Sequence, residues 1–248
     1  MQRRELICKA LALAAAGAAP MVAQARTAET GPGCITMAKP RERERVKVAF
    51  LLSEGTTVMN IVGPWEVFQD VTLNGRGARN PFELYTVAES PEPLRLSGGM
   101  TIVPDFTFSQ APPPQVLVVP TSRGSEASVD YIRRVSAGNH ITMSVCTGAF
   151  LLGRAGLLDG LTATTHHEFQ DEFAHDFPGV RLVRNTRFVE HERVATSAGL
   201  TAGVDLALRV VERYYGREIA QSTAHFMAHE GEAWKVALRR SSRVQIVA

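Results

Sequence analysis

Cys146 is the residue of this chain best placed to do chemistry. It stands between an apolar run, residues 141–145, and a segment of small residues that begins with Gly148 and Ala149. In a nucleophile elbow a strand leads into a sharp turn with the nucleophile at its tip, and a helix follows. The free N–H groups at the start of that helix favour the thiolate, the reactive form of cysteine. The alternative is a buried core cysteine, which is common in globular proteins.

The segments around Cys146 predict a sheet that holds it at an edge. Apolar runs of strand length cover residues 46–52, 82–88, 116–119 and 141–145, without the polar alternation of a half-exposed strand. Alternation of these runs with helical segments predicts an α/β fold, a flavodoxin-like three-layer sandwich with a mostly parallel central sheet. Ligands bind at the carboxyl ends of strands in such sheets, and Cys146 follows one of those ends.

Helical patterns fill the intervals between the strands. We expect a helix to open at Gly63-Pro64, and another over residues 165–175 with a capping box made by Thr165 and Glu168. Apolar residues at helical spacing predict further helices at 126–136, 147–155, 200–215 and 218–229. A hairpin is expected around residues 191–193.

The N-terminus has the layout of an export signal. Arg3 and Arg4 precede a stretch, residues 6–19, that is apolar apart from Lys9, and residues 23–25 read as a cleavage site. The paired arginines are typical of the twin-arginine route. The alternatives are an uncleaved membrane anchor and a mis-assigned start. We therefore predict a signal peptide over 1–25, a periplasmic or secreted protein and no stable membrane insertion after cleavage.

The rest of the chain divides into three parts. Residues 26–45 mix Gly, Pro and alternating charges and predict a flexible leader, which contains Cys34. Residues 46–230 form the expected α/β domain, and residues 231–248 a loose C-terminal tail. Removing residues 1–25 takes away three basic residues and one acidic residue, which leaves 24 of each and no net charge. The full chain has a formal net charge of +2, which gives no electrostatic case for nucleic acid, so we expect no nucleic-acid partner.

Several motifs resemble those of the ThiJ/PfpI superfamily, which has the class I glutamine amidotransferase-like fold. They lie at residues 63–68, 97–99, 104–108, 144–149, 156–160, 163–166 and 196–205. Within the superfamily the chain is most similar to isocyanide hydratases and to the amidotransferase-like domains of AraC-type regulators. The resemblance implies that Cys146 is the nucleophile, that a small molecule is the ligand or substrate and that the protein is a homodimer. We expect no cofactor.

Two positions depart from the family pattern. Isocyanide hydratases carry an Asp three positions before the Gly-Pro motif, and the wider superfamily often carries Glu, whereas this chain has Asn60. An amide cannot act as general acid or base, although it can donate a hydrogen bond or simply shape the turn. The family's Pro-Gly-Gly loop is replaced here by residues 120–124. We still expect backbone N–H groups of Thr121 and Ser122 to face the cysteine as an oxyanion cradle, together with Thr147 and Gly148.

The histidines offer one further candidate. His166 matches a family position beside the pocket and is a possible partner of Cys146, although in hydratase relatives the matching residue is not the base. His225 and His229 lack a third ligand with metal-site spacing, so we expect no metal. Three functions remain open: a cysteine-dependent hydratase acting on a small electrophile such as an isocyanide, a general thiol hydrolase, and a non-catalytic ligand-binding or redox-sensing protein.

Overall fold

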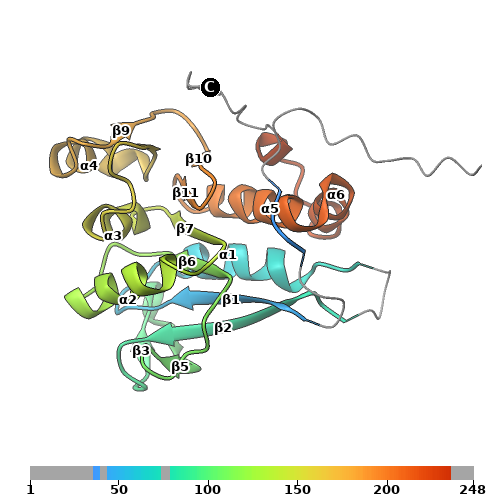
Figure 1. The fold of residues 1–248 in the computed structure, drawn as a ribbon, viewed down its shortest axis with the longest axis horizontal. Helices are drawn as coiled ribbons and strands as arrows, with labels where there is room; N and C mark the ends of the chain where they lie inside the picture. The colour runs from blue at the N-terminus through green and yellow to red at the C-terminus, as the bar shows by residue number, and fades with distance from the viewer. Residues whose placement is uncertain (1–35, 40–43, 74–78, 236–248) are drawn as a thin grey trace, which may run out of the picture. The chain divides into compact units, whose positions relative to one another are not determined.

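The computed structural model of the chain describes residues 36–39, 44–73 and 79–235 (Figure 1). The predicted signal peptide, most of the predicted leader and Cys34 lie outside the described residues, so those expectations stay predictions. Among the described helices, none is long and apolar enough to cross a membrane.

A seven-stranded sheet forms the centre of the domain. Its strands lie in the order β10 (Phe188–Glu190), β11 (Val194–Ser197), β7 (Ile141–Val145), β6 (Val116–Val119), β1 (Val46–Leu51), β2 (Phe82–Ala88) and β5 (Phe106–Thr107). All neighbours pair in parallel except β10 and β11, which form the predicted antiparallel hairpin. The carboxyl ends of β6, β7 and β11 therefore meet at one edge.

Alternate side chains of the inner strands enter two separate apolar cores. Val48 and Phe50 of β1 belong to one core, whereas Ala49 and Leu51 belong to the other. Successive side chains of a strand point to opposite faces, so a strand covered on both sides must be apolar throughout. This is why the inner strands read as continuous apolar runs.

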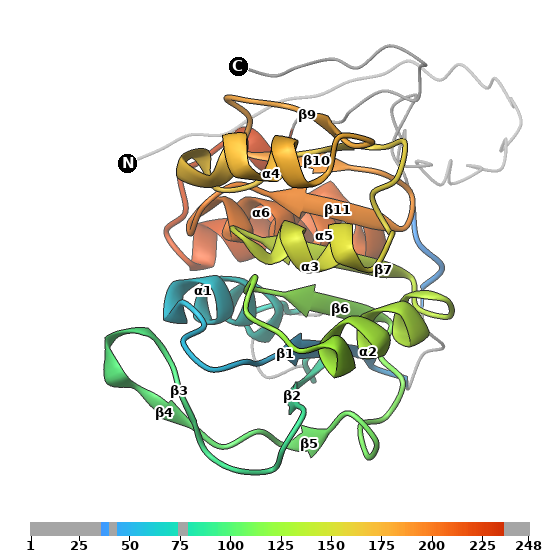
Figure 2. The same ribbon diagram turned by 90° about the vertical axis from the view of Figure 1, so that its left-hand side faces the viewer.

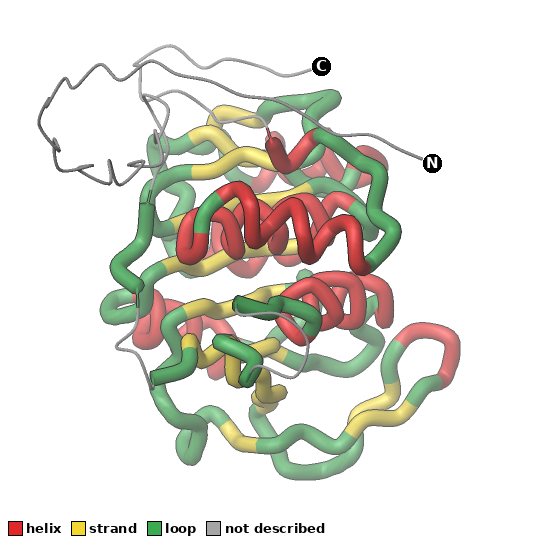
Figure 3. Tube along the Cα trace, turned by 90° about the vertical axis from the view of Figure 1, so that its right-hand side faces the viewer, coloured by secondary structure: helices red, strands yellow, loops and turns green. Residues whose placement is uncertain are grey.

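Helices cover both faces of the sheet. Figure 2 shows α2 (Glu126–Ser136), α3 (Gly148–Arg154) and α4 (Gln170–Asp176) on the near face, and Figure 3 is drawn from the opposite side. The other face carries α1 (Val58–Gln69), α5 (Ala202–Tyr215) and α6 (Arg217–Phe226). The predicted three-layer α/β sandwich is confirmed.

The smaller elements lie outside this sandwich. Strands β3 (Leu94–Arg95) and β4 (Thr101–Ile102) form a separate antiparallel pair, and β8 (Thr162–Ala163) pairs in parallel with β9 (Arg181–Leu182). Three short 3₁₀ helices cover Ser97–Gly99, His167–Phe169 and Ala233–Lys235. Trp234, inside the stretch predicted as a loose tail, is buried, so packing reaches further along the chain than the sequence indicates.

Helix α1 begins at Val58, so the prediction that it opens at Gly63-Pro64 is wrong. Pro64 lies inside the helix, where its missing N–H leaves the carbonyl of Asn60 without the usual donor. The same part of the helix packs closely on α5, since a Cβ at Gly63 would lie 3.1 Å from Val204. The early start brings Asn60 into a helix and buries it.

The expected capping box at Thr165 is also wrong. The Thr165 hydroxyl donates to the carbonyl of Cys146 (2.9 Å), and His166 caps the following turn by accepting from the N–H of Glu168 (3.3 Å). The later helices are shorter than predicted, because α5 begins at Ala202 and α6 ends at Phe226. Leu200 precedes α5 with φ 50°, and His229 follows α6.

Candidate functional site

Cys146 forms the turn between β7 and α3. Its φ is 60°, in the left-handed region that costs a residue with a Cβ about 1–2 kcal/mol. Its N–H donates to the carbonyls of Ser197 (3.2 Å) and Ala198 (3.0 Å), and its own carbonyl accepts from Thr165. Contacts with two other segments thus hold the strained turn in place.

Gly148 allows the elbow to close. A Cβ at this position would overlap the carbonyl oxygen of Val119 at the end of β6. Only glycine lets α3 start this close to the neighbouring strand. The structure therefore gives Gly148 a packing role, and its predicted contact with substrate stays a prediction.

The thiol side of Cys146 faces the α1 and α5 layer. Cys146 belongs to the same apolar cluster as Ile61 of α1 and Val204 of α5, and it is 7% exposed. The residues of α3 that follow it, Ala149 and Phe150, pack in the opposite core. The thiol is therefore nearly buried, on the side of the sheet that α1 and α5 cover.

Asn60 is fixed next to the elbow by one hydrogen bond. Its Nδ2 donates to the carbonyl of Pro120 (2.9 Å), and Pro120 directly follows Val119, the partner of Ser144 in the parallel register. Its Oδ1 is buried and accepts no hydrogen bond among the described residues. An acceptor of this kind can bind a donor on a water or ligand. The amide thus lies beside the carbonyl of Pro120, and its expected role in the reaction stays a prediction.

Some polar groups of the loop after β6 form hydrogen bonds within the loop itself. The Thr121 hydroxyl accepts from the N–H of Arg123 (3.0 Å), and Thr121 is buried. The Arg123 side chain packs against Gly55, where an added Cβ would lie 3.2 Å from its guanidinium. Ser122, which stands between Thr121 and Arg123 in the sequence, is half-buried. The Thr121 hydroxyl thus shapes this loop, and the expected part of the Thr121 and Ser122 N–H groups in an oxyanion cradle stays a prediction.

Thr147 begins α3 directly after the cysteine. It is half-buried, and its side chain makes no capping hydrogen bond. The first N–H groups of a helix have no partner inside the helix. The N–H groups of Thr147 and Gly148 are thus the first donors after the cysteine, and their part in an oxyanion cradle stays a prediction.

His166 lies beside the elbow without reaching the thiol by a hydrogen bond among the described residues. It follows Thr165, which bonds Cys146, and its ring packs on Gly199. Its Nδ1 accepts from the N–H of Glu168, so the neutral ring carries its proton on Nε2. Burial lowers the pKa of His166, and His167 lowers it further, against a rise caused by Glu168. A neutral His166 near Cys146 follows from this setting.

Arg187 and Asp205 are residues of this edge whose pairing the sequence does not reveal. Arg187 Nε pairs with Asp205, and the buried Asp205 also accepts from Nε2 of His229 (2.9 Å). In the sequence, Asp205 is explained by its place in the first turn of a helix, and Arg187 and His229 stand far from it. No sequence pattern predicts this pairing, because it depends on three segments meeting in space. Among the described residues, no group of three metal-ligating side chains is present.

Known proteins share both the sequence pattern and the fold. An isonitrile hydratase of Pseudomonas putida is 30% identical over 182 residues, which cover 71% of this chain and 75% of that protein. The HTH-type transcriptional regulator GbdR of Pseudomonas aeruginosa is 26% identical, over 77% of this chain and 53% of the regulator. A ThiJ/PfpI family protein of Pseudomonas syringae superposes with a TM-score of 0.66 at 26% identity and covers 84% of both chains.

The regulators overturn one expectation. We predicted no nucleic-acid partner from the small net charge of +2, and this prediction is wrong, because relatives of this chain include HTH-type transcriptional regulators. Net charge describes the surface of one domain and says nothing of the assemblies in which such a domain serves. This chain spans about half of the length of those regulators.

The family model supplies the remaining comparison. The model of the DJ-1/PfpI family matches residues 46–213, from the first strand of the sheet to α5. That match contains the Cys146 elbow, Asn60, the loop after β6 and His166. The resemblance seen in the motifs is confirmed, and the chain belongs to the DJ-1/PfpI family.

Proposed function

We propose that this protein is a cysteine-dependent hydratase or hydrolase of small electrophiles, similar in its chemistry to isonitrile hydratase. The observation that carries the proposal is the strained Cys146 on its elbow, followed by the N–H groups of Thr147 and Gly148. Strained residues cluster at functional sites because the surrounding structure must hold them there. The isonitrile hydratase of Pseudomonas putida supports the choice of reaction.

The proposed reaction has two steps. The Cys146 sulfur bonds to the terminal carbon of an isocyanide while the thiol proton passes to that carbon, which gives a thioimidate. Water then adds to the same carbon, the carbon–sulfur bond breaks, and the released product is an N-substituted formamide with the thiol restored. N–H donors near Thr121, Ser122, Thr147 and Gly148 stabilise charge in these steps, and the unpartnered Oδ1 of Asn60 orients the water.

Mass spectrometry of the intact protein tests the nucleophile. A thiol-selective probe at neutral pH should label Cys146 in the intact protein. Cys146→Ser should abolish this labelling and the formation of formamide, whereas Cys34→Ser, the matched control, should leave both unchanged. Formamide production that survives in Cys146→Ser would refute the proposal.

A second experiment tests Asn60. Asn60→Asp places a carboxyl group beside the carbonyl of Pro120, in a buried site that favours its protonated form. Because a carboxyl can transfer protons and an amide cannot, turnover should rise. Unchanged turnover in the purified variant would argue against a role of this position in the reaction.

The second candidate function is a ligand-binding or redox-sensing protein. It is favoured by the similarity to transcriptional regulators and by the amide at position 60, where a catalytic carboxylate is absent. Absence of Cys146 labelling at neutral pH, together with absence of turnover, would favour it. Sulfenic or sulfinic acid at Cys146 after mild oxidation would identify the redox form.

We also propose that the protein is exported and that two copies assemble. The sequence of residues 1–25 supports export, and the family resemblance supports a homodimer. The mass of the protein from a periplasmic fraction should lack residues 1–25, and light scattering should give twice the chain mass. A full-length or monomeric species would overturn the respective proposal.

A further inference from the structure

Three segments end side by side at the edge of the sheet that carries Cys146. The N–H of Cys146 donates to the carbonyl of Ala198 (3.0 Å), and the N–H of Ala198 donates to the carbonyl of Arg187 (2.8 Å). These bonds continue the ladder of β7, β11 and β10, which are neighbours in Figure 2. Neighbouring strands lie about 4.8 Å apart, so the backbones of Arg187 and Cys146, two strands apart, are separated by about 10 Å.

The guanidinium of Arg187 and the thiol of Cys146 both lie on the side of the sheet that α5 covers. Arg187 reaches Asp205 in the first turn of α5, and Cys146 packs in the cluster that includes Val204, the residue before Asp205. A ligand that spans the two groups would lie along the start of α5.

The guanidinium of Arg187 is held in one orientation. Its Nε pairs with Asp205, and its Nη2 donates to the hydroxyl of Thr201 (3.2 Å). Asp205 is 1% exposed and is itself fixed by His229, whereas the Arg187 side chain is 44% exposed. Arginine has five N–H donors in a rigid fork, so two used on the inner side leave donors on the outer side for a ligand.

We propose that Arg187 is an anion-binding residue of the Cys146 site and that it selects small molecules carrying a carboxylate. Asp205 and Thr201 are positioning residues that aim the guanidinium. A single arginine, already partly neutralised by Asp205, suits a planar monoanion better than a dianion, because its fork matches the two oxygens of a carboxylate. The inference rests on the proposed reactive thiol and names the class of substrate or ligand that the site takes.

The test compares two alkylating reagents of similar size, iodoacetate and iodoacetamide, on a chain with Cys8 and Cys34 replaced by Ser. In both reactions the Cys146 sulfur bonds to the CH₂ carbon and iodide leaves, and the reagents differ in their negative charge. Arg187→Gln should lower the ratio of the iodoacetate rate to the iodoacetamide rate by about fivefold. Arg184→Gln is the matched control, because its side chain is 49% exposed and also pairs with an aspartate.

The outcomes separate the alternatives. An unchanged ratio in Arg187→Gln, or an equal fall in Arg184→Gln, would overturn the inference. Arg187→Lys keeps a cation beside Asp205 and should give an intermediate ratio, which shows the effect even if the Gln variant fails to fold. A purely structural salt bridge would change the melting temperature and leave the ratio unchanged.

A binding measurement keeps this inference distinct from the proposed function. If Cys146 reacts with neither reagent, the proposed nucleophile is refuted, and binding to Cys146→Ser then decides the role of Arg187. Propanoate, and not propanamide, should raise the melting temperature of Cys146→Ser. Adding Arg187→Gln should remove that rise, and a rise that persists would overturn the inference.

Discussion

The backbone of Cys146 shows how a single residue is prepared for chemistry. A left-handed angle at a residue with a Cβ is unfavourable, and here three hydrogen bonds, from and to the neighbouring segments, maintain it. The turn lifts the thiol away from the line of β7 and towards α1 and α5. The strain is therefore a consequence of placing the sulfur at the edge of the sheet.

This strain predicts an unusual order of stability among variants. The free energy of unfolding of Cys146→Gly should be about 0.5–1 kcal/mol higher than that of Cys146→Ala, because glycine adopts this angle without steric cost. At Ala149 in α3 the usual order should hold, and Ala149→Gly should lose about 1 kcal/mol. Urea denaturation of the three variants measures both differences. A more stable alanine at position 146 would contradict the strain.

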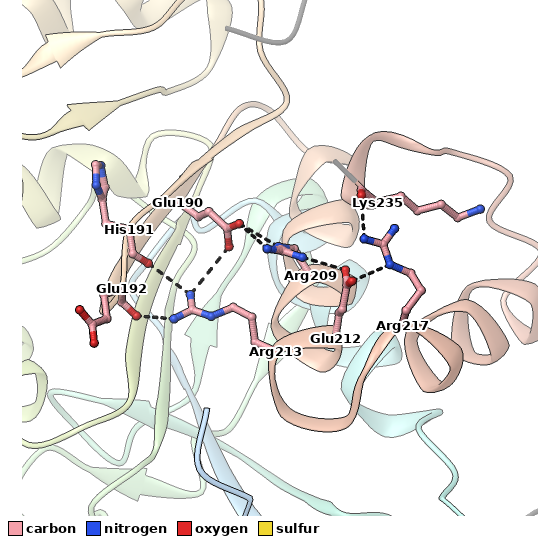
Figure 4. Close-up of polar contacts among 8 residues, drawn as sticks. All are labelled: Glu190, His191, Glu192, Arg209, Glu212, Arg213, Arg217 and Lys235. Carbon is pink, nitrogen blue, oxygen red and sulfur yellow. Dashed lines mark hydrogen bonds and ion pairs between the residues drawn. The ribbon is translucent and has the colours of Figure 1, made fainter. Parts of the chain in front are cut away.

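At the scale of elements, a buried ion network joins the hairpin at the sheet edge to α5 and α6 (Figure 4). Arg209 of α5 bonds Glu190 of β10 (2.8 Å) and Glu212 (2.9 Å), and Glu212 accepts from Arg217 of α6 (2.5 Å). Arg213 adds bonds to the carbonyls of the hairpin turn. The network thus anchors β10, the edge strand that directly follows Arg187.

Breaking this network should be costly. Glu190→Gln leaves the fully buried Arg209 beside a neutral amide, and we expect the free energy of unfolding to fall by about 3 kcal/mol. Asp171→Asn breaks the exposed pair with Arg184 and should cost under about 1 kcal/mol. Chemical denaturation of both variants gives the comparison. Equal losses would show that burial adds nothing to the Glu190 interaction.

Across the whole molecule, two histidines connect stability to pH. His140, which directly precedes β7, forms a hydrogen bond with the hydroxyl of Tyr214 in α5 (2.8 Å). Burial lowers the pKa of His140, and Arg193 lowers it further. The pKa of His166 is lowered too, chiefly by burial. The folded protein therefore binds fewer protons than the unfolded chain below the usual histidine pKa of about 6.5, and stability falls as the pH drops through this range.

Denaturation at pH 7 and at pH 5.5 tests this dependence. The wild-type protein should lose stability at the lower pH, and His140→Gln should lose less, because the variant no longer has that proton to take up on unfolding. His175→Gln is the control, since that side chain is 89% exposed. A loss in His140→Gln equal to that of the wild type would show that His140 does not contribute.

The sequence by itself determined the sheet, its two-sided cover and the elbow. Continuous apolar runs indicate strands that are buried on both faces, and the small residues after Cys146 indicate the close approach of α3 to Val119. These features leave periodic or local marks, so they can be read along the chain. The start of α1 could not be read along the chain. Gly63-Pro64 has the local signature of a helix start, and only packing on α5 overrides it.

Only the tertiary structure decided which polar groups meet around Cys146. The bond from Asn60 to Pro120, the use of Thr165 on the Cys146 carbonyl and the pairing of Arg187 with Asp205 each join segments far apart in sequence. Such contacts depend on the parallel register and on which helix covers which face. A single sequence has no local pattern that records them, and they are what turns a cysteine at a strand end into a defined site.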